Sequence, residues 1–342
     1  MRNVVRVLGL SLVLLIVVGA AAFYGLYFLN TPQVRGVPQE VSFRVDSGES
    51  LTGVATRLHE EGLLRRPEIL RIVSRLRGTD GRLQSGRYLL SNDLSAVQIH
   101  EILTTGRQVL QRVTIPEGWT IRRIAARLEE HGILAASDFI AVVNDEDFAA
   151  SLGITANSLE GYLYPDTYYF VEDFPAERVA AHMVERFLGV LEDIYPEYET
   201  LSPEFIHERV VLASIIEREY ISPDEAPLMA SVFQNRLDAN MRLESCATVV
   251  YVMTEEEGLA HPSRLFYRDL ERASPYNTYR NVGLPPGPIS NPGQTALNAA
   301  FHPAESDYWF FVLRGPGADR HHFSRSLYEH SEAAVLYLRG TR

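Results

Sequence analysis

The stretch Val210-Val-Leu-Ala-Ser-Ile-Ile-Glu-Arg-Glu-Tyr220 decides the fold, because seven uncharged residues run directly into two carboxylates. A helix start precedes it: Ser202 is a suitable cap, and Pro203 suits the first helical position. Apolar groups then lie on all sides of the predicted helix. We therefore expect this helix to be buried nearly all round.

The two carboxylates at the end of this stretch are predicted to face different ways. Glu217 and Glu219 are two positions apart, which is about 200° around a helix. Glu219 lies seven residues past Leu212 and three past Ile216, so it extends one apolar stripe. Apolar surroundings disfavour a charged carboxylate, and the pKa of Glu219 is therefore expected to be raised, as a general acid requires. The structural alternative is that each Glu pairs with an arginine at the helix end.

Composition limits the classes of function. The chain has 342 residues, 46% of them apolar, which suggests two or three domains. The net charge of −12 argues against nucleic acid as a partner, because phosphate binding needs a basic surface. Cys246 is the only cysteine, so no internal disulfide is expected.

The N-terminal segment predicts the compartment. Residues 8–29 are 22 residues without a charge, which is long enough to span a hydrocarbon core of about 30 Å. Arginines precede this run, so residues 1–7 are expected to be a cytoplasmic tail. A cleaved signal peptide ending at Ala20-Ala21-Ala22 is the alternative, but the apolar run continues beyond it. In either case the chain from Thr31 onward is predicted to lie outside the cytoplasm.

A sequence repeat follows a short linker at 30–39. Residues 44–64 and 114–134 are similar at a constant offset of 70, so that Gly48 matches Gly118 and Gly62 matches Gly132. Each copy predicts a short strand, a turn at a glycine and a capped helix that ends at a second glycine. The similarity is weaker beyond this part of each copy.

The complete repeat unit is predicted to be strand–helix–helix–strand–helix, with the last strand of the second copy at Gly161–Tyr164. The expected fold class is therefore α+β, preceded by the N-terminal transmembrane helix. The first repeat would occupy 40–110. The second would occupy 111–200 and merge into a C-terminal domain at 201–342.

The second repeat contains a segment with an unusual composition, Ser158–Phe170. It has five aromatic residues together with Glu160 and Asp166. Flat aromatic faces suit sugar rings, and carboxylates suit hydroxyl groups or a glycosidic oxygen. The alternative is an aromatic strand on the core followed by a Pro-Asp turn. Further along, the Pro- and Gly-rich loop Gly283–Gly293 is typical of segments that shape a groove.

No metal or cofactor is predicted. His321, His322 and His330 lie close together in the sequence, but their spacing matches no zinc pattern, and Cys246 stands alone. No phosphate loop, GxGxxG or GxSxG motif is present, which argues against nucleotide enzymes and α/β-hydrolase serine chemistry.

Six motifs occur in an order and spacing that resemble one known family, the MltG (YceG-like) endolytic murein transglycosylases. The resemblance covers nearly the whole chain and is most specific from Ser158 to His330. The motifs are LEGYLYPDTY (Leu159–Tyr168), ASIIERE (Ala213–Glu219), VFQNRL (Val232–Leu237), SPYNTY (Ser274–Tyr279), GLPPGPISNPG (Gly283–Gly293) and H-x-F…H at His321, Phe323 and His330.

The resemblance implies a single-pass protein of the inner membrane, with a LysM-like domain and then a catalytic domain on the periplasmic side. The family cuts the β-1,4 bond between N-acetylmuramic acid and N-acetylglucosamine inside peptidoglycan strands, and leaves a 1,6-anhydro-muramyl end without using water. Its catalytic Glu falls on Glu219. Penicillin-binding synthases are partners expected at the level of the family. One departure is Cys246-Ala247, where the family commonly has Asp-Pro.

Seven further residues are predicted to contact substrate or to stabilise an oxocarbenium-like transition state: Glu160, Tyr162, Asp166, Glu217, Asn235, Asn277 and Tyr279. Glu160 is expected to lie on the last strand of the second repeat and to face Glu219 across a groove, with the two carboxyls within about 15 Å.

Two alternatives remain open at this point. One is a hydrolytic muramidase, with Glu219 as the acid and Glu160 or Asp166 as the base or nucleophile. The other is a scaffold without catalytic activity, whose repeats bind peptidoglycan while the carboxylates are structural.

Overall fold

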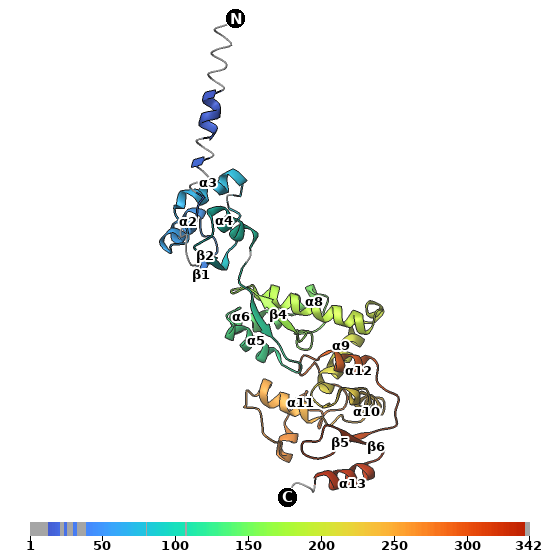
Figure 1. Cartoon of the computed structure of the whole chain (residues 1–342). Coiled ribbons are helices and arrows are strands. Elements are labelled where there is room, and N and C mark those ends of the chain that lie inside the picture. The colour runs from blue at the N-terminus through green and yellow to red at the C-terminus, as the bar shows by residue number, and fades with distance from the viewer. Residues whose placement is uncertain are drawn as a thin grey trace, which may run out of the picture. The chain divides into compact units, whose positions relative to one another are not determined.

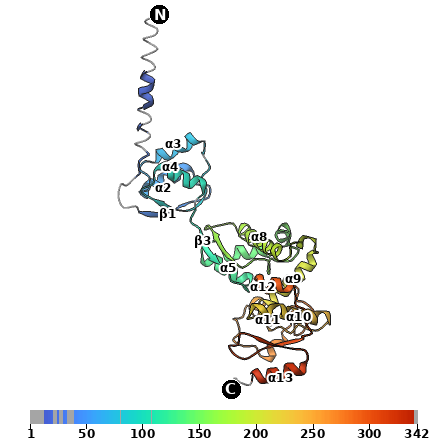
Figure 2. The same cartoon turned by 45° about the vertical axis from the view of Figure 1, so that its right-hand side comes forward.

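The structure is a computed structural model that describes residues 13–20, 24–25, 30–32, 39–79, 81–106 and 108–338. The chain divides into two compact units. Unit 1 is Met1–Gln111 with Val171–Asp173, and unit 2 is Arg112–Phe170 with Phe174–Arg342. Figures 1 and 2 show the elements of each unit from two directions.

No helix in the described part of the chain is long and apolar enough to cross a membrane. Residues 13–20 are helical. The predicted anchor at 8–29 lies partly outside the described residues, so it stays a prediction.

Unit 1 has five elements in the predicted order strand–helix–helix–strand–helix: β1 (Glu40–Val45), α2 (Leu51–Glu60), α3 (Pro67–Arg77), β2 (Gly86–Ser91) and α4 (Ala96–Thr105). The two strands pair antiparallel, from Glu40 opposite Ser91 to Val45 opposite Gly86. Hydroxyl caps start two of the helices, because Ser50 accepts the Gly53 N–H and Ser95 accepts the Gln98 N–H. Alternate strand residues and one face of each helix close a small core around Phe43, Leu58, Leu70, Tyr88 and Ile99.

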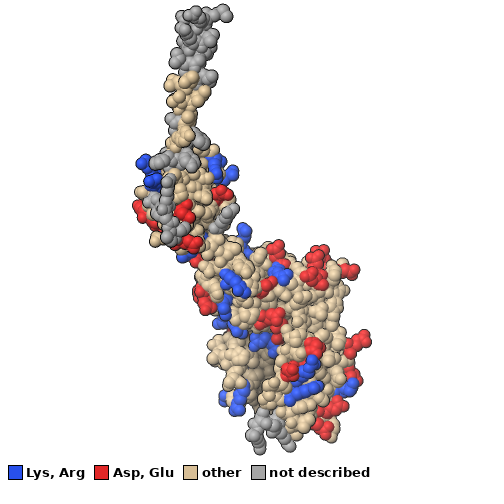
Figure 3. All heavy atoms as spheres, viewed as in Figure 1, with Lys and Arg blue, Asp and Glu red and all other residues tan. Residues whose placement is uncertain are grey.

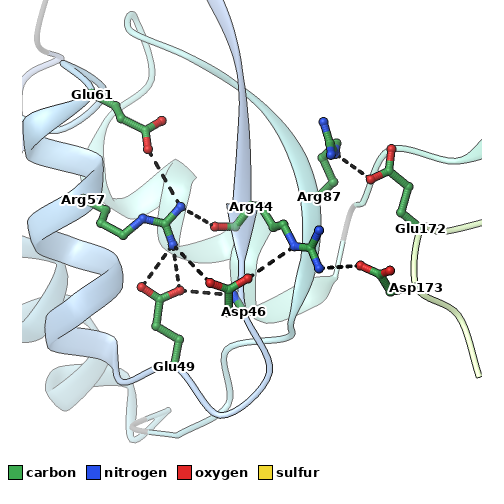
Figure 4. A network of polar contacts seen from close by, with 8 residues as sticks. All are labelled: Arg44, Asp46, Glu49, Arg57, Glu61, Arg87, Glu172 and Asp173. Atoms are coloured by element: carbon green, nitrogen blue, oxygen red, sulfur yellow. Dashed lines mark hydrogen bonds and ion pairs between the residues drawn. The ribbon is translucent and has the colours of Figure 1, made fainter. Parts of the chain in front are cut away.

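Ion pairs attach the short segment Val171–Asp173 to unit 1 (Figure 4). Arg44 on β1 contacts Asp173 at 2.5 Å, and Arg87 on β2 contacts Glu172 at 2.7 Å. Arg57 lies among three more carboxylates of unit 1: Asp46, Glu49 and Glu61. Ion pairs with exposed partners stabilise a fold only weakly. These pairs therefore position the segment Val171–Asp173 but contribute little to the stability of unit 1.

The first half of unit 2 has the same order of elements with one helix added: β3 (Gln111–Thr114), α5 (Ile121–Glu130), α6 (Ala136–Val143), α7 (Glu146–Ser151), β4 (Thr167–Phe170) and α8 (Ala176–Ile194). β3 and β4 form the two-stranded sheet. The predicted strand at Gly161–Tyr164 is wrong, because the chain turns there and pairs only at β4. Gly161 has φ +90°, and a Cβ atom on it would lie 2.5 Å from the Pro288 side chain.

The second half of unit 2 contains the remaining helices and strands: α9 (Pro203–Ile216), α10 (Ala226–Asp238), α11 (Cys246–Tyr251), α12 (Gln294–Phe301), β5 (Phe310–Leu313), β6 (His321–Ser324) and α13 (Leu327–Leu338). Short helical turns connect them at Tyr198–Thr200, Pro223–Glu225, Val252–Glu256 and Tyr267–Glu271. β5 and β6 form an antiparallel hairpin beside α13.

Helix α9 is the centre of this half, and it packs against α10 and α12. The Ser202 hydroxyl caps it by accepting the Phe205 N–H at 3.2 Å, and every residue of Val210–Ile216 is buried. The predicted start and burial of the helix are therefore confirmed. Its predicted continuation through Glu219 is wrong. The Ile216 carbonyl accepts both the Glu219 and the Tyr220 N–H groups, so the chain leaves the helix in a tight turn over 217–219.

Candidate active site

Glu219 lies in the turn after α9 and lines a cavity of about 310 Å³. Its carboxylate accepts a hydrogen bond of 2.5 Å from the Ser245 hydroxyl and another from the backbone of Ala247. Ser245 directly precedes α11 and is itself buried, and its N–H donates to the Thr278 hydroxyl at 3.1 Å. A loop far from Glu219 in sequence thus holds the carboxyl group in place.

Burial is the main influence on the acid strength of Glu219. It raises the pKa of this carboxyl, although the hydrogen bonds from Ser245 and Ala247 and the charges of His321 and Arg218 act in the opposite direction. The net effect is a raised pKa, as predicted. A carboxyl of this kind can hold a proton near neutral pH and donate it.

The rest of the cavity offers aromatic, hydroxyl and charged groups. Tyr279 lines it, and its hydroxyl lies 3.1 Å from the Cys246 thiol. Arg236 is buried there and donates to the carbonyls of Trp309 and Leu243 and to the Glu244 carboxylate. Apolar surface comes from Phe233, Phe310, Phe311 and Leu327. This mixture suits a sugar, which has apolar ring faces and polar edges.

Glu217 points away from this cavity, as its spacing from Glu219 predicts. Its carboxylate accepts the Gly293 N–H at 2.9 Å, where α12 begins. Burial raises the pKa of Glu217 to about 7, and the neighbouring charge of Glu117 adds to this rise. The structure thus gives Glu217 a role in joining the end of α9 to α12.

Glu160 lies in a turn and not on a strand, which corrects the prediction. Both carboxylate oxygens accept the Ile121 N–H, at 3.0 and 3.2 Å, and one also accepts the Asn291 amide at 2.8 Å. Glu160 is 6% exposed and lines a different cavity, together with Tyr251 and others. The two carboxyls therefore do not share one cavity, and Glu160 fastens the start of α5 to the 289–293 loop.

Glu160→Gln is expected to flatten the pH dependence of stability. Burial raises the pKa of Glu160 to about 8 from an ordinary value of 4.5. Its contribution to the free energy of unfolding is therefore full below pH 4.5 and is lost as the pH rises through about 8. Gln cannot ionise but keeps an acceptor oxygen. Urea unfolding at about pH 5 and about pH 8 checks this, and equal losses of stability in both proteins would contradict it.

Tyr162 and Asp166 are also outside the cavity of Glu219. Tyr162 is 2% exposed, and its hydroxyl bonds to the His207 ring at 2.8 Å. Asp166 accepts the Arg186 Nε–H at 2.8 Å. Although partial burial acts to raise the pKa of Asp166, the hydrogen bonds from Arg186 and Thr167 lower it overall. These side chains hold the Ser158–Phe170 segment to the core.

The two predicted asparagines hold loops. Asn235 donates to the carbonyls of Ser306 and Tyr308, at 3.0 and 2.9 Å. Asn277 is 0% exposed, and its amide donates to the carbonyls of Leu270 and Arg272. Of the seven predicted substrate contacts, the structure brings only Tyr279 into the cavity of Glu219.

Asn291 is the main residue that sequence reasoning missed. Its side-chain oxygen accepts the N–H groups of Gly161 and Leu163, both at 2.9 Å. Its amide donates to the Trp119 carbonyl at 2.9 Å and to Glu160 at 2.8 Å. One buried side chain thus joins the turn before α5, the aromatic segment and the Pro- and Gly-rich loop. The sequence feature that could have pointed to Asn291 is its position in the Pro- and Gly-rich loop Gly283–Gly293.

The histidines near the C-terminus are engaged separately. His321 forms a buried pair with Glu225, whose carboxylate accepts the His321 backbone N–H and lies 2.9 Å from the ring Nδ1, and His330 stacks on Phe310. Within the residues that the structure describes, no group of three or more His, Cys, Asp or Glu side chains is placed to hold a metal ion.

Fold and site together define an α+β protein whose C-terminal unit presents the Glu219 carboxyl, with a raised pKa, in a cavity of aromatic and polar side chains, an arrangement suited to general acid chemistry. The chain belongs to the YceG-like family, whose profile matches residues 43–335.

Proteins similar to this chain come from several bacteria. The chain is 30% identical to the endolytic murein transglycosylase of Bacillus subtilis, over 94% of this chain and 91% of that protein. It is 28% identical to the endolytic murein transglycosylase of Streptococcus pneumoniae strain D39, over 88% of this chain but only 60% of that longer protein. A crystal structure of a YceG-like protein from Listeria monocytogenes superposes with a TM-score of 0.56 at 32% identity, covering 86% of this chain and 99% of that one.

Proposed function

We propose that this protein is an endolytic peptidoglycan lytic transglycosylase with Glu219 as its acid and base. It would cut the β-1,4 bond between N-acetylmuramic acid and N-acetylglucosamine within a strand, and leave a 1,6-anhydro-muramyl end. The observation that carries the proposal is the Glu219 carboxyl, which has a raised pKa and lies in a cavity with aromatic walls. The names of the relatives support the substrate class.

The reaction needs one carboxyl acting twice. Protonated Glu219 gives its proton to the glycosidic oxygen as the bond from that oxygen to the anomeric carbon breaks. The resulting carboxylate takes the proton of the muramyl 6-hydroxyl, and the hydroxyl oxygen bonds to the anomeric carbon. The proton is thereby returned and no water is consumed. Ser245 and Ala247 stabilise the ionised intermediate state of Glu219 by donating to it.

The positions of the other carboxylates favour this reaction over hydrolysis with Glu160 or Asp166 as the second carboxylate. A muramidase needs a second carboxylate near the first, to activate water or to attack the sugar. Glu160 lines another cavity, and Asp166 is bound to Arg186. Glu244 does line the cavity of Glu219, but it is paired with Arg236 at 3.2 Å. Because Glu244 is the other carboxylate in the lining of this cavity, it is the candidate second carboxylate in a hydrolytic alternative.

The ends of the products distinguish these reactions. The full chain is incubated with purified peptidoglycan strands, and mass spectrometry reads the new muramyl ends. Anhydro ends, lighter by one water than reducing ends, support the proposal. Reducing ends would assign the protein as a hydrolase and turn attention to Glu244. Strands that are bound but never cut would favour the scaffold alternative.

Ser245→Ala is expected to move the alkaline limb of the pH–rate profile upward by about one pH unit. The Ser245 hydroxyl stabilises the ionised carboxylate, so its removal raises the pKa of Glu219 further. The acid then stays protonated to a higher pH. Initial rates of strand cleavage across the neutral range check this. An alkaline limb that stays in place, or moves down, would show that this hydrogen bond does not tune the acid.

We also propose the location and surroundings of the protein. Residues 8–29 would anchor it in the inner membrane, with residues 1–7 in the cytoplasm and both units on the periplasmic side. An enzyme that ends nascent strands close to the membrane would work beside penicillin-binding synthases that extend them. Protease protection in spheroplasts tests the orientation, because externally added protease should degrade both units.

A further inference from the structure

A second cavity, of about 400 Å³, lies beside Glu219 and has a surplus of positive charge. Three arginines line it: Arg122 and Arg123 near the start of α5, and Arg218 in the turn after α9. His261 lines it as well, and Glu255 is its one acidic residue. On the face that Figure 3 shows, acidic and basic side chains are largely interspersed, so a cavity with this composition is unlike that surface.

Two of the three arginines have no carboxylate partner in the described part of the chain. Glu255 accounts for Arg122, which it contacts at 3.3 Å through its carboxylate and at 3.0 Å through its carbonyl. Arg218 donates one hydrogen bond, to the Gly118 carbonyl at 3.0 Å. Arg123 stacks over the Trp119 ring at 4.6 Å. Neither Arg123 nor Arg218 makes an ion pair with any described residue.

The two unpaired guanidinium groups also disfavour each other. Burial lowers the pKa of Arg218, and the positive charge of Arg123 lowers it further, whereas the more weakly acting charges of Glu219, Glu255 and Glu217 oppose this. Like charges held together in a half-buried cavity are unfavourable until an anion lies between them. Guanidinium groups match carboxylates in geometry and can bind them through two parallel hydrogen bonds.

The cavity adjoins the acid on the other side of the start of α11. Arg218 directly precedes Glu219 in the chain. Ala247 lines this cavity, and its backbone donates to the Glu219 carboxylate. The rest of the wall is mixed: Val250, Leu259 and Ile289 supply apolar surface, and hydroxyl-bearing side chains come from Thr120, Tyr251 and Thr254. A ligand here would thus have a negative group and small apolar parts, and would lie next to the bond that is cut.

We propose that this cavity binds a free carboxylate of the peptide stem carried by the muramyl residue beside the cleaved bond, with Arg123 and Arg218 as its ligands. This inference rests on the proposed function. A peptide stem supplies the required chemistry, since it has carboxylates together with the methyl groups of alanine. Trp119 holds the Arg123 guanidinium in place through stacking. The enzyme would therefore recognise strands that still carry peptides.

The test compares two substrates in the full-length protein: peptidoglycan strands with their peptides, and the same strands after an amidase has removed them. We expect the wild type to have a lower KM for peptide-bearing strands. Arg123→Gln should raise KM for these strands about 5- to 10-fold, with kcat little changed, and leave KM for the bare strands unaltered. Arg123→Lys, which keeps the charge, should restore part of the difference.

Arg127→Gln is the matched control. Arg127 is on the same helix and also stacks over Trp119, at 5.0 Å, but does not line the cavity. It should leave both KM values unchanged. Equal increases of KM for both substrates in Arg123→Gln, or no increase in either, would overturn the proposal. The preference should also weaken at high salt, because charge attraction is screened.

Failure of the carboxylate site can be distinguished from failure of the proposed function. If the wild type cuts neither kind of strand, sedimentation of the protein with insoluble strands still measures binding. A preference for peptide-bearing strands that Arg123→Gln abolishes would support the carboxylate site without the enzyme. Equal binding to both kinds of strand would overturn it.

Discussion

Glu219→Gln is expected to lower the rate of glycan cleavage by at least about 10³-fold while the protein stays folded. General acid and base groups each contribute roughly 10²- to 10⁴-fold, and here a single carboxyl serves in both steps. Gln has the same shape but cannot release a proton to the glycosidic oxygen. Its side-chain oxygen still accepts the Ser245 hydroxyl, so the hydrogen bond that holds this position in the wild type is kept.

The measurement is the initial rate of release of new muramyl ends, together with a thermal unfolding curve. Both proteins should unfold at nearly the same temperature, since the removed charge is one that burial already disfavours. A variant that unfolds early would leave the catalytic conclusion unsupported. In that case Glu219→Asp, which keeps the carboxyl but shortens the side chain, provides the second variant and should retain part of the activity.

Glu217→Gln is the matched control, because this residue lies in the same turn and has a pKa raised by the same burial, to about 7. Its carboxylate accepts the Gly293 N–H outside the cavity of Glu219. We expect a change of less than about 10-fold in its rate. If Glu217→Gln were as inactive as Glu219→Gln, the assignment of the acid to one residue would be wrong.

The sequence was informative where local physics decides the structure. The seven uncharged residues Val210–Ile216 give a helix with apolar groups on all sides, which predicts burial all round. The structure confirms this, because every one of them is buried. The repeat likewise predicted the order of elements, because turn glycines act within a few residues of the chain. The predicted hydroxyl cap is confirmed at Ser50 of the first copy but not at Thr120 of the second, whose side chain makes no cap hydrogen bond to α5. The raised pKa of Glu219 followed from its apolar neighbours, even though the residue lies beyond the helix end.

Hydrogen-bond partners were the part that sequence reasoning could not supply. Ser245 is 26 residues from Glu219, and a serine before a short helix gives no sign that it will meet a particular carboxylate. Carboxylates and amides such as Glu160 and Asn277 have the chemistry to bind a sugar, and the structure uses them on backbone groups instead. Polar residues in loops serve both purposes, and only the fold decides between them.

Hydrogen bonds between loops give a physical explanation for some of the collinear motifs. Two of them meet at Asn291, because this residue of the Gly283–Gly293 motif contacts the aromatic motif Leu159–Tyr168 and also the turn before α5. The same loop is tied to the last turn of α9, because Ile289 N–H donates to the Ser214 hydroxyl and the Ser290 hydroxyl donates to the Ser214 carbonyl. The loop thus connects the aromatic motif and the turn before α5 to the end of the helix that directly precedes Glu219.

Asn291→Ala is therefore expected to destabilise unit 2 by about 3–5 kcal/mol. The substitution removes the acceptor of the Gly161 and Leu163 N–H groups and a donor to both Glu160 and the Trp119 carbonyl. Each buried group left without a partner costs roughly 1–3 kcal/mol, and the sum is reduced because water can enter and the Trp119 carbonyl keeps the Asn291 backbone N–H.

Urea unfolding followed by near-ultraviolet circular dichroism measures this loss, and the transition of unit 2 should move to lower urea without a large change in slope. The matched control is Asn298→Ala, at an exposed position of α12, which should change stability by less than about 0.5 kcal/mol. Asn291→Asp keeps the shape but places a second carboxylate against Glu160, so it should destabilise the protein more at about pH 8 than at about pH 5. A loss no larger than that of Asn298→Ala would show that these hydrogen bonds do not hold the three segments together.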